Sequence, residues 1–177
     1  MPKIAGPEKL KSDLELRKDV QNKIPKDYLP MWLREREIET RQVEPMDLLK
    51  AEKLPPYRST WMKPTGKLPK DERIHQALLL YCSDMGLLGA AVNPHEVNFM
   101  SKKFQSASLD HVMWFHGKVN FNDWILHHMH SPISQNARGF SRGSIYTKAG
   151  KLIASTAQEG LMRIWDCLLY TSDAADE

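Results

Sequence analysis

The amino-acid sequence predicts an α+β fold, in which an antiparallel β-sheet is wrapped around one central apolar helix. A strongly apolar segment with helical periodicity lies near the middle of the 177 residues. Segments rich in branched and aromatic residues, which are typical of strands, lie on both sides of it. A short turn at 148–150 joins the last two of these segments and predicts an antiparallel hairpin. This order of elements is typical of a sheet that packs against a helix.

The first 70 residues are expected to be extended and linker-like, because nine of the 11 prolines lie there. Residues 8–23 carry apolar side chains at roughly helical spacing, which predicts a short surface helix that ends before Pro25. Weak alternation from Glu35 to Pro45 predicts an exposed or edge strand. A second strand is expected at 58–63, between flanking prolines.

The central helix is expected to begin after Pro69 and to end at Gly86, a residue type that suits the position just after a helix. Asp71 and Glu72 place acidic groups at the positive end of the helix dipole. The apolar residues recur at helical spacing and cover nearly the whole circumference: Ile74, Ala77, Leu78, Leu79, Leu80, Tyr81, Cys82 and Met85. A helix that is apolar nearly all round is expected to be buried on several sides.

Aromatic and branched residues predict four strands after the helix, at 109–116, 123–131, 138–147 and 152–158. We expect the large apolar side chains of the first two strands to lie in the core or to line a channel: Met113, Trp114, Phe115 and Trp124.

Composition argues against several classes of protein. No apolar run approaches the length of a membrane-spanning helix, and the N-terminus has no apolar segment typical of a secretion signal, so an intracellular location is expected. The two cysteines, Cys82 and Cys167, are too few for a disulfide framework or a four-cysteine zinc site. The net charge is +3, but the basic residues are interspersed with acidic ones, which does not favour binding to nucleic acid.

Three histidines in the strand at 123–131 are the candidates for a metal site. Alternation along the strand places His128 and His130 on one face and His127 on the other. Two imidazoles on one face could bind zinc if a carboxylate joined them. A polar strand face explains the same residues equally well, so the sequence predicts neither a metal nor an organic cofactor.

Three motifs resemble those of the type II acyl-CoA thioesterases, double-hotdog enzymes of bacteria and peroxisomes. The motifs are HQALLLYCSD at 75–84, LDHVMWFH at 109–116 and ASTAQEGLMR at 154–163, within a similarity that spans residues 35–163. The resemblance implies a hotdog fold and the hydrolysis of fatty acyl-CoA to free fatty acid and coenzyme A, a reaction of lipid metabolism. It also implies a location in the peroxisome of a eukaryote or in the cytoplasm of a bacterium.

The family carries two hotdog repeats in each chain, and this sequence resembles the second of them. We therefore expect residues 1–34 to be an inter-repeat linker and residues 35–166 to form the C-terminal hotdog domain. Residues 167–177 resemble a translated sequencing adapter and are expected to be an artefactual tail. A lone repeat would expose a strand edge that is paired in the family. The expected partner is therefore a second copy of the chain or an N-terminal hotdog repeat.

The resemblance also implies a catalytic network of three side chains at the positions that match the family motifs. These are Asp84 in YCSD, Ser108 in SLDH and Gln158 in AQEG. The implied mechanism has no covalent intermediate, because the three side chains hold and activate a water molecule that attacks the thioester carbonyl. Apart from the resemblance, the same residue types are also common as a loop carboxylate, a turn serine and a surface amide.

The chemistry of thioester hydrolysis suits these residue types. Asp84 supplies an anion that can accept a proton from water, and its place at the end of an apolar helix predicts that it is buried. Ser108 can donate to Asp84 while it accepts from water, and Gln158 can orient the water or contact the carbonyl. We expect a backbone N–H to be the oxyanion donor, which contributes about 3 to 4 kcal/mol in such sites.

Five other hypotheses concern further residues and alternative functions. A G-x-S-x-G pattern occurs at 139–143 (GFSRG), but it lies inside a predicted strand and not at a strand-to-helix turn, so it does not indicate a serine hydrolase. Asp110 and His111 are neighbours in a predicted strand and point to opposite sides, so they are not expected to form a charge-relay pair, and a hotdog hydratase is disfavoured for lack of its Asp/His pair. Arg138 and Arg142 could meet coenzyme A phosphates or be solvated. The alternative function is an inactive hotdog module that binds acyl-CoA or completes an oligomer.

Overall fold

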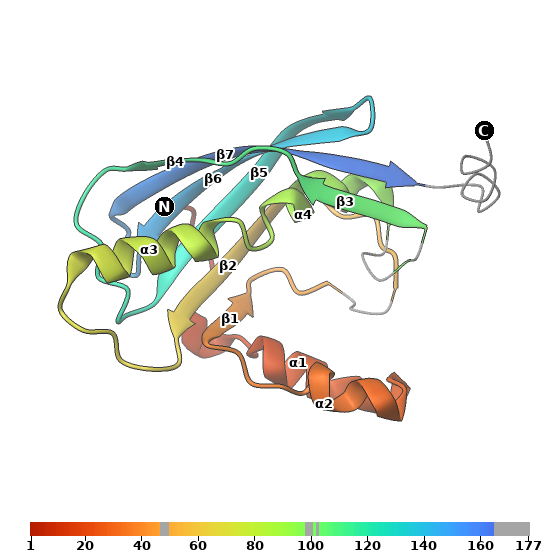
Figure 1. Cartoon of the computed structure of the whole chain (residues 1–177), viewed down its shortest axis with the longest axis horizontal. Helices are drawn as coiled ribbons and strands as arrows, with labels where there is room; N and C mark the ends of the chain where they lie inside the picture. Colours follow the sequence, from red (N-terminus) through yellow and green to blue (C-terminus); the bar gives the residue numbers. More distant parts are fainter. Residues whose placement is uncertain (47–49, 98–100, 102, 165–177) are drawn as a thin grey trace, which may run out of the picture.

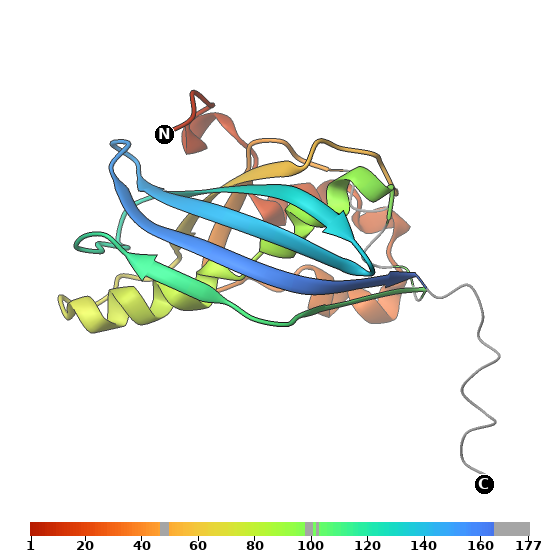
Figure 2. The same ribbon diagram turned by 90° about the horizontal axis from the view of Figure 1, so that it is seen from above.

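The protein was studied as a computed structural model, which describes residues 1–46, 50–97, 101 and 103–164. Within these residues an antiparallel sheet of seven strands curls over a helix, which confirms the predicted α+β fold (Figures 1 and 2). The strand order is β1-β2-β5-β6-β7-β3, and β4 also pairs with β7. The strands are β1 (Ile38–Gln42), β2 (Tyr57–Pro64), β3 (Phe104–Ser108), β4 (Val112–Phe115), β5 (Ile125–Gln135), β6 (Arg138–Thr147) and β7 (Leu152–Ile164). The predicted tail at 167–177 and the predicted domain end at 166 lie outside the described residues.

Four α-helices accompany the sheet in the described ranges: α1 (Asp13–Asp19), α2 (Leu29–Trp32), α3 (Glu72–Ser83) and α4 (Leu87–Val92). Helices α3 and α4 lie along the concave side of the sheet, whereas α1 and α2 lie together beside β1 (Figure 1). Short 3₁₀ turns occur at η1 (Pro7–Lys9), η2 (Gln21–Lys23), η3 (Lys26–Tyr28) and η4 (Asn93–His95). The short surface helix expected within 8–23 is α1, which a capping box between Ser12 and Glu15 begins.

The main core fills the space between α3 and the concave face of the sheet. Its fully buried members come from α3, the loop between β4 and β5, and the strands: Leu79, Cys82, Phe121, Ile125, Ile145, Ile153 and Ala154. A second cluster of Trp61, Trp124 and Leu126 is covered by Ile4 and Leu10 of the N-terminal segment. The indole of Trp61 donates to the carbonyl of Ala5 at 2.9 Å, which satisfies its one polar group. Residues near the N-terminus therefore pack against the sheet.

Helix α3 begins where the sequence predicts but buries a different face. Asp71 caps it by accepting from the backbone N–H of Arg73, and Gly86 follows it in the left-handed conformation, with φ of 79°. The buried residues are His75, Leu79, Cys82 and Ser83. Leu80 is 46% exposed and Tyr81 is 67% exposed, so the expectation of burial on several sides is wrong for this chain. A helix with two apolar faces packs only one of them onto its own sheet.

The edge strand along β7 is interrupted by a bulge. Of the predicted strand at 109–116 only β4 is a strand, and β3, which was not predicted, precedes it along the same edge (Figure 2). Ser108 lies opposite Gly160 and Val112 lies opposite Ala157. Residues 109–111 therefore face only residues 158 and 159, which is the extra residue that defines a β-bulge. Trp114 and Phe115 of β4 are half exposed, so the expectation that they belong to the core is wrong, whereas Trp124 is buried.

Helix α4 was not predicted, because its sequence LLGAAV reads as part of a loop after Gly86. It packs closely against β6 and β7, where Gly139 and Gly160 leave room for its side chains. A Cβ atom at Gly160 would lie 2.6 Å from a methyl group of Leu88, and one at Gly139 would lie 2.5 Å from the Cβ of Ala91. The glycine of the AQEG motif therefore makes room for α4 rather than for a turn. This close packing fixes the chain just after Asp84.

Candidate active site

The structure brings together the three residues that the sequence motifs single out. The hydroxyl of Ser108 donates to Oδ1 of Asp84 at 3.1 Å. The amide Nε2 of Gln158 donates to the same hydroxyl oxygen at 2.8 Å. A carboxylate, a hydroxyl and an amide from three remote segments thus form one hydrogen-bonded chain.

Each of these side chains is positioned by a different element. Asp84 is the C-cap of α3, and Ser108 is the last residue of β3. Gln158 lies inside β7, with only 1% of its surface exposed. Because Ser108 is paired with Gly160, it lies on the same face of the sheet as Gln158, two residues along β7. Asp84 is exposed in the described chain, so its predicted burial is wrong.

Two further residues extend this chain of hydrogen bonds and were not identified from the sequence. His111 lies with Nδ1 2.5 Å from Oε1 of Gln158 and with Nε2 2.7 Å from the hydroxyl of Ser83. Ser83 is fully buried on α3, directly before Asp84. In a regular strand His111 and Ser108 would point to opposite faces, since three positions separate them. The bulge turns both toward Gln158, and no pattern in the sequence announces the bulge.

Asp110 and His111 point apart, although the regular strand assumed for them is absent. The carboxylate of Asp110 accepts from the backbone N–H of Glu159 at 2.7 Å, while His111 faces Gln158. Asp110 therefore holds the bulge against β7. No direct contact links the two side chains in a charge-relay pair among the described hydrogen bonds.

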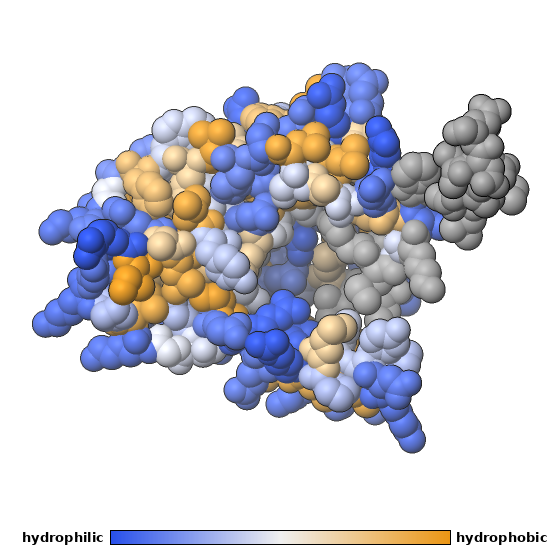
Figure 3. All heavy atoms as spheres, in the orientation of Figure 1, coloured by the Kyte–Doolittle hydropathy of each residue, from blue (hydrophilic) through white to orange (hydrophobic). Residues whose placement is uncertain are grey.

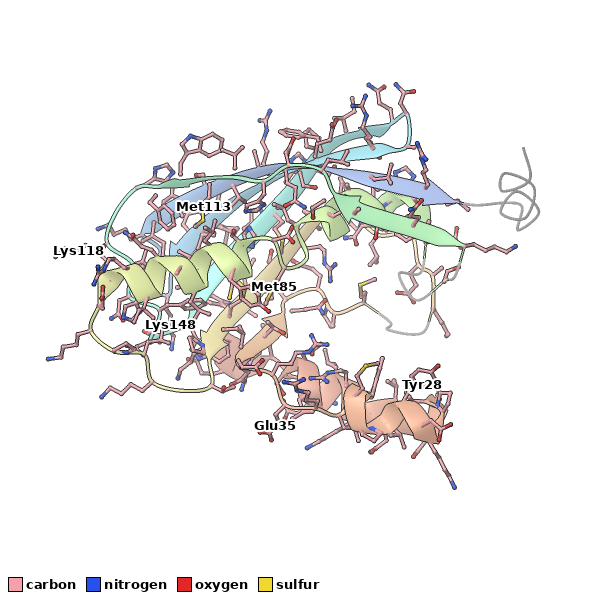
Figure 4. The ribbon with its side chains drawn as sticks, viewed as in Figure 1. Tyr28, Glu35, Met85, Met113, Lys118 and Lys148 are labelled. Carbon is pink, nitrogen blue, oxygen red and sulfur yellow. The ribbon has the colours of Figure 1, made fainter. Side chains whose placement is uncertain are left out.

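An open, largely apolar cleft of ≈ 520 Å³ lies directly beside Asp84 and Ser108. It is lined by residues of α3 and of the bulge: Ala77, Leu80, Tyr81, Asp84, Ser108, Leu109, Asp110 and His111. The space-filling view shows apolar side chains gathered over α3 (Figure 3). Met85 and Met113, which pack against the core beneath this region, lie between the helix and the sheet (Figure 4).

A second hollow of ≈ 360 Å³ lies on the other side of the same two residues. It is lined by Arg58, Gly86, Leu88, Gly89, Ser106 and Ala107 together with Asp84 and Ser108. The guanidinium of Arg58 donates to Gln42 at 3.1 Å. Burial lowers the pKa of Arg58, and the negative charge of Glu44 opposes that shift. Asp84 and Ser108 thus stand at the boundary between two hollows of different character.

Burial shifts the pKa of two titratable groups near this network. His127 is fully buried beside Thr156, and desolvation lowers its pKa to about 3, with smaller contributions from the charges of His111 and His128. Burial raises the pKa of the Cys82 thiol to about 12. Both groups are therefore uncharged at neutral pH.

The other candidate ligands lie away from the site. His128 contacts the hydroxyl of Ser59 at 3.0 Å, and the described residues contain no group of three or more metal-binding side chains. Arg138 pairs with Glu159 at 3.2 Å, and Arg142 stacks on Phe140. Both arginines alternate with the inward residues of β6, so they lie on the opposite face of the sheet from Gln158.

Comparison with known proteins supports one family. Residues 32–161 match the family described as acyl-CoA thioesterase. Acyl-CoA thioesterase 2 of Haemophilus influenzae is 34% identical over 163 residues, which are 92% of this chain and 57% of that protein. Acyl-coenzyme A thioesterase 8 of Homo sapiens is 30% identical over 171 residues, which are 93% of this chain and 53% of that protein.

A solved structure gives the same result. The crystal structure of the acyl-CoA thioesterase II TesB2 from Mycobacterium marinum is similar, with a TM-score of 0.68 and 29% identity, over 94% of this chain and 56% of that one. The chain therefore spans about half the length of the relatives that it matches. In the described part of the chain, none of the helices has the length and apolar character needed to cross a membrane.

Proposed function

The chain belongs to the acyl-CoA thioesterase family, and we propose that it hydrolyses fatty acyl-CoA to a free fatty acid and coenzyme A. The observation that carries this proposal is the hydrogen-bonded chain of Asp84, Ser108 and Gln158, of which Asp84 and Ser108 line an apolar cleft. An acyl chain needs an apolar surface, and the thioester needs an activated water at its carbonyl carbon.

In the proposed reaction Asp84 is the general base. It accepts a proton from a water molecule whose oxygen forms a bond to the thioester carbonyl carbon. The C–S bond then breaks, and the coenzyme A thiolate leaves with the electron pair and takes up a proton. The carboxylate meets Ser108 through Oδ1, so Oδ2 can face the water. No metal or organic cofactor enters these steps.

Gln158 and Ser108 orient the reactants in this mechanism. Ser108 has one hydroxyl proton, which it donates to Asp84, so it accepts from Gln158. The second N–H of the Gln158 amide is then available for the attacking water or the carbonyl oxygen. An amide cannot compete as a nucleophile, which suits a mechanism without a covalent intermediate.

In this proposal the two hollows bind different parts of the substrate. We place the acyl chain in the cleft beside Leu80, Tyr81 and Leu109, because its lining is mostly apolar. The hollow that contains Arg58 takes the polar coenzyme A arm, since a guanidinium there can meet a phosphate or an amide oxygen. Asp84 and Ser108 border both, so a thioester that spans the two hollows has its carbonyl at the network.

The partner is proposed to be a second hotdog unit, provided in the isolated chain by a second copy. Exposed Leu80 and Tyr81 on α3 and the half-exposed apolar side chains of β4 leave an uncovered apolar surface beside the site. The chain also spans about half the length of its relatives.

The domain bounds and the location are part of the same proposal. Residues 35–166 form the hotdog domain and residues 1–34 the linker. The reaction takes place in a peroxisome or a bacterial cytoplasm.

Sedimentation of the purified chain tests the partner. A dimer that Leu80→Glu separates into monomers is expected, because a charge would be buried at the contact. A chain that stays monomeric up to high concentration would instead favour an N-terminal hotdog repeat as the partner.

The catalytic proposal is tested with the purified chain, a long-chain acyl-CoA and a reagent that detects the released thiol. Asp84→Asn should lower kcat by about 10²- to 10⁴-fold, because loss of a general base has that effect. Asp71→Asn, at the other end of α3, is the matched control, since Asn caps a helix as well as Asp. Tight binding of acyl-CoA without turnover by the unmodified chain would contradict the proposal and favour an inactive binding module.

A further inference from the structure

We infer that His111 is a positioning residue, which fixes the orientation of the Gln158 amide and is itself held by Ser83. This inference rests on the proposed function, because it concerns how the network is arranged for thioester hydrolysis. His111 lies 2.5 Å from Oε1 of Gln158, and its other ring nitrogen lies 2.7 Å from the Ser83 hydroxyl. The ring is half buried between α3 and β7.

The direction of each hydrogen bond follows from the ionised carboxylate of Asp84. A carboxylate only accepts, so Ser108 donates its single proton to Asp84. Ser108 must then accept from an N–H of Gln158, which turns the amide oxygen toward His111. An amide oxygen only accepts, so Nδ1 of His111 carries a proton and donates it. One arrangement of donors therefore satisfies the whole chain.

Without a donor at His111 this arrangement loses its stabilisation. The oxygen of the Gln158 amide would then have no N–H to accept from at position 111, although the amide is almost fully buried. A buried acceptor without a partner destabilises this arrangement, so the Gln158 side chain is no longer held in the position from which it donates to Ser108. An amide that has left this position no longer offers its N–H to the attacking water or to the carbonyl.

Ser83 holds the other side of the imidazole ring. Its hydroxyl lies 2.7 Å from Nε2 of His111 and 2.7 Å from the carbonyl of Leu80. When Nε2 has no proton, the hydroxyl donates to it; when Nε2 is protonated, the hydroxyl accepts from it and donates to Leu80. Nδ1 keeps its proton toward Gln158 in both states. The residue before Asp84 thus anchors the residue that orients Gln158.

Two variants of nearly the same shape test the role of the donor at position 111. In His111→Asn the amide nitrogen can occupy the place of Nδ1 and donate to Gln158, whereas His111→Leu has branches of similar size and no donor. We expect kcat of His111→Asn to stay within about threefold of the unmodified chain. His111→Leu should lose about 100-fold in kcat with little change in KM, because a misoriented group costs about that factor.

The matched control is His116→Ala. His116 also contacts a serine hydroxyl, with Nε2 2.9 Å from Oγ of Ser155, but it lies on the exposed surface. This variant should leave kcat unchanged. Thermal unfolding of each variant checks that the chain folds. Equal losses in His111→Asn and His111→Leu, or full kcat in His111→Leu, would overturn the inference.

Nitrogen-15 NMR of the imidazole side chains gives a readout that needs no activity. The His111 signal, assigned by its loss in His111→Asn, should show a proton on Nδ1. A proton on Nε2 alone would overturn the inference even in an active enzyme. A chain that hydrolyses no acyl-CoA would end the proposed function, and the NMR result would still decide how Gln158 is oriented.

Discussion

Ser108 lies opposite Gly160 in the ladder between β3 and β7, and this pairing brings its hydroxyl to 2.8 Å from the amide of Gln158. The same glycine also receives the side chain of Leu88 from α4. The site therefore depends on the register of one ladder and on how closely one short helix approaches it. Changes at the contact between α4 and the sheet should disturb both stability and catalysis.

Gly139→Ala tests this contact. Its new Cβ would lie 2.5 Å from the Cβ of Ala91, an atom that cannot rotate away, so α4 would have to shift. We expect the free energy of unfolding to fall by about 1 to 3 kcal/mol, measured by urea denaturation. Gly66→Ala, where a Cβ meets nothing within 4 Å, is the matched control. If the two variants were equally stable, the close packing of α4 would be contradicted.

Leu79 and Leu80 are adjacent leucines on opposite faces of α3. Leu79 is 0% exposed, so Leu79→Ala should cost about 2 to 5 kcal/mol of unfolding free energy. Leu80 is half exposed, so Leu80→Ala should cost about 0.5 kcal/mol or less in a dilute, monomeric sample. Chemical denaturation of both variants measures the difference, and a larger loss in Leu80→Ala would reverse the assignment of the buried face.

His127 should make stability depend on pH. Burial lowers its pKa from 6.5 to about 3 in the folded chain, so the unfolded chain binds a proton first as the pH falls. Its contribution is complete above the unfolded pKa of about 6.5 and is lost toward lower pH, by up to about 1.4 kcal/mol per pH unit. In His127→Asn, which cannot be protonated there, unfolding measured from pH 7 to pH 5 should have a shallower slope. An unchanged slope would contradict this assignment.

Cys82 should be unreactive in the folded protein. Its thiol is fully buried, and burial raises its pKa to about 12, so almost no thiolate forms near neutral pH. A disulfide reagent at pH 8, applied to a Cys167→Ser variant, should label the chain in urea but leave the native chain unlabelled for hours. Rapid labelling without denaturant would show that the site opens to solvent.

The sequence predicts the regular elements well and fails where packing decides. The start of α3 and the strand at 138–147 are found where expected. The buried face of α3 was not predictable, because leucines occur on both of its faces and only the tertiary structure decides which one meets the sheet. Helix α4 was missed because its glycine and alanines lack an amphipathic pattern, and they are small because the sheet lies so close.

The site was predictable in part. Asp84, Ser108 and Gln158 were identified because their motifs resemble those of a family. Their residue types alone would not have identified them. His111 was missed because a regular strand places it on the other face, and the single extra residue at 109–111 reverses that. A bulge depends on the register of its partner strand, which the local sequence does not encode.

The most direct test of the account is a single-turnover hydrolysis in water enriched in ¹⁸O, with the protein in excess over a long-chain acyl-CoA. If water held by Asp84, Ser108 and Gln158 attacks the carbonyl directly, the fatty acid of the first turnover carries one ¹⁸O atom. A first-turnover product that contains only ¹⁶O, with the label found later in the Asp84 carboxylate, would contradict the account, because the aspartate would then be the nucleophile.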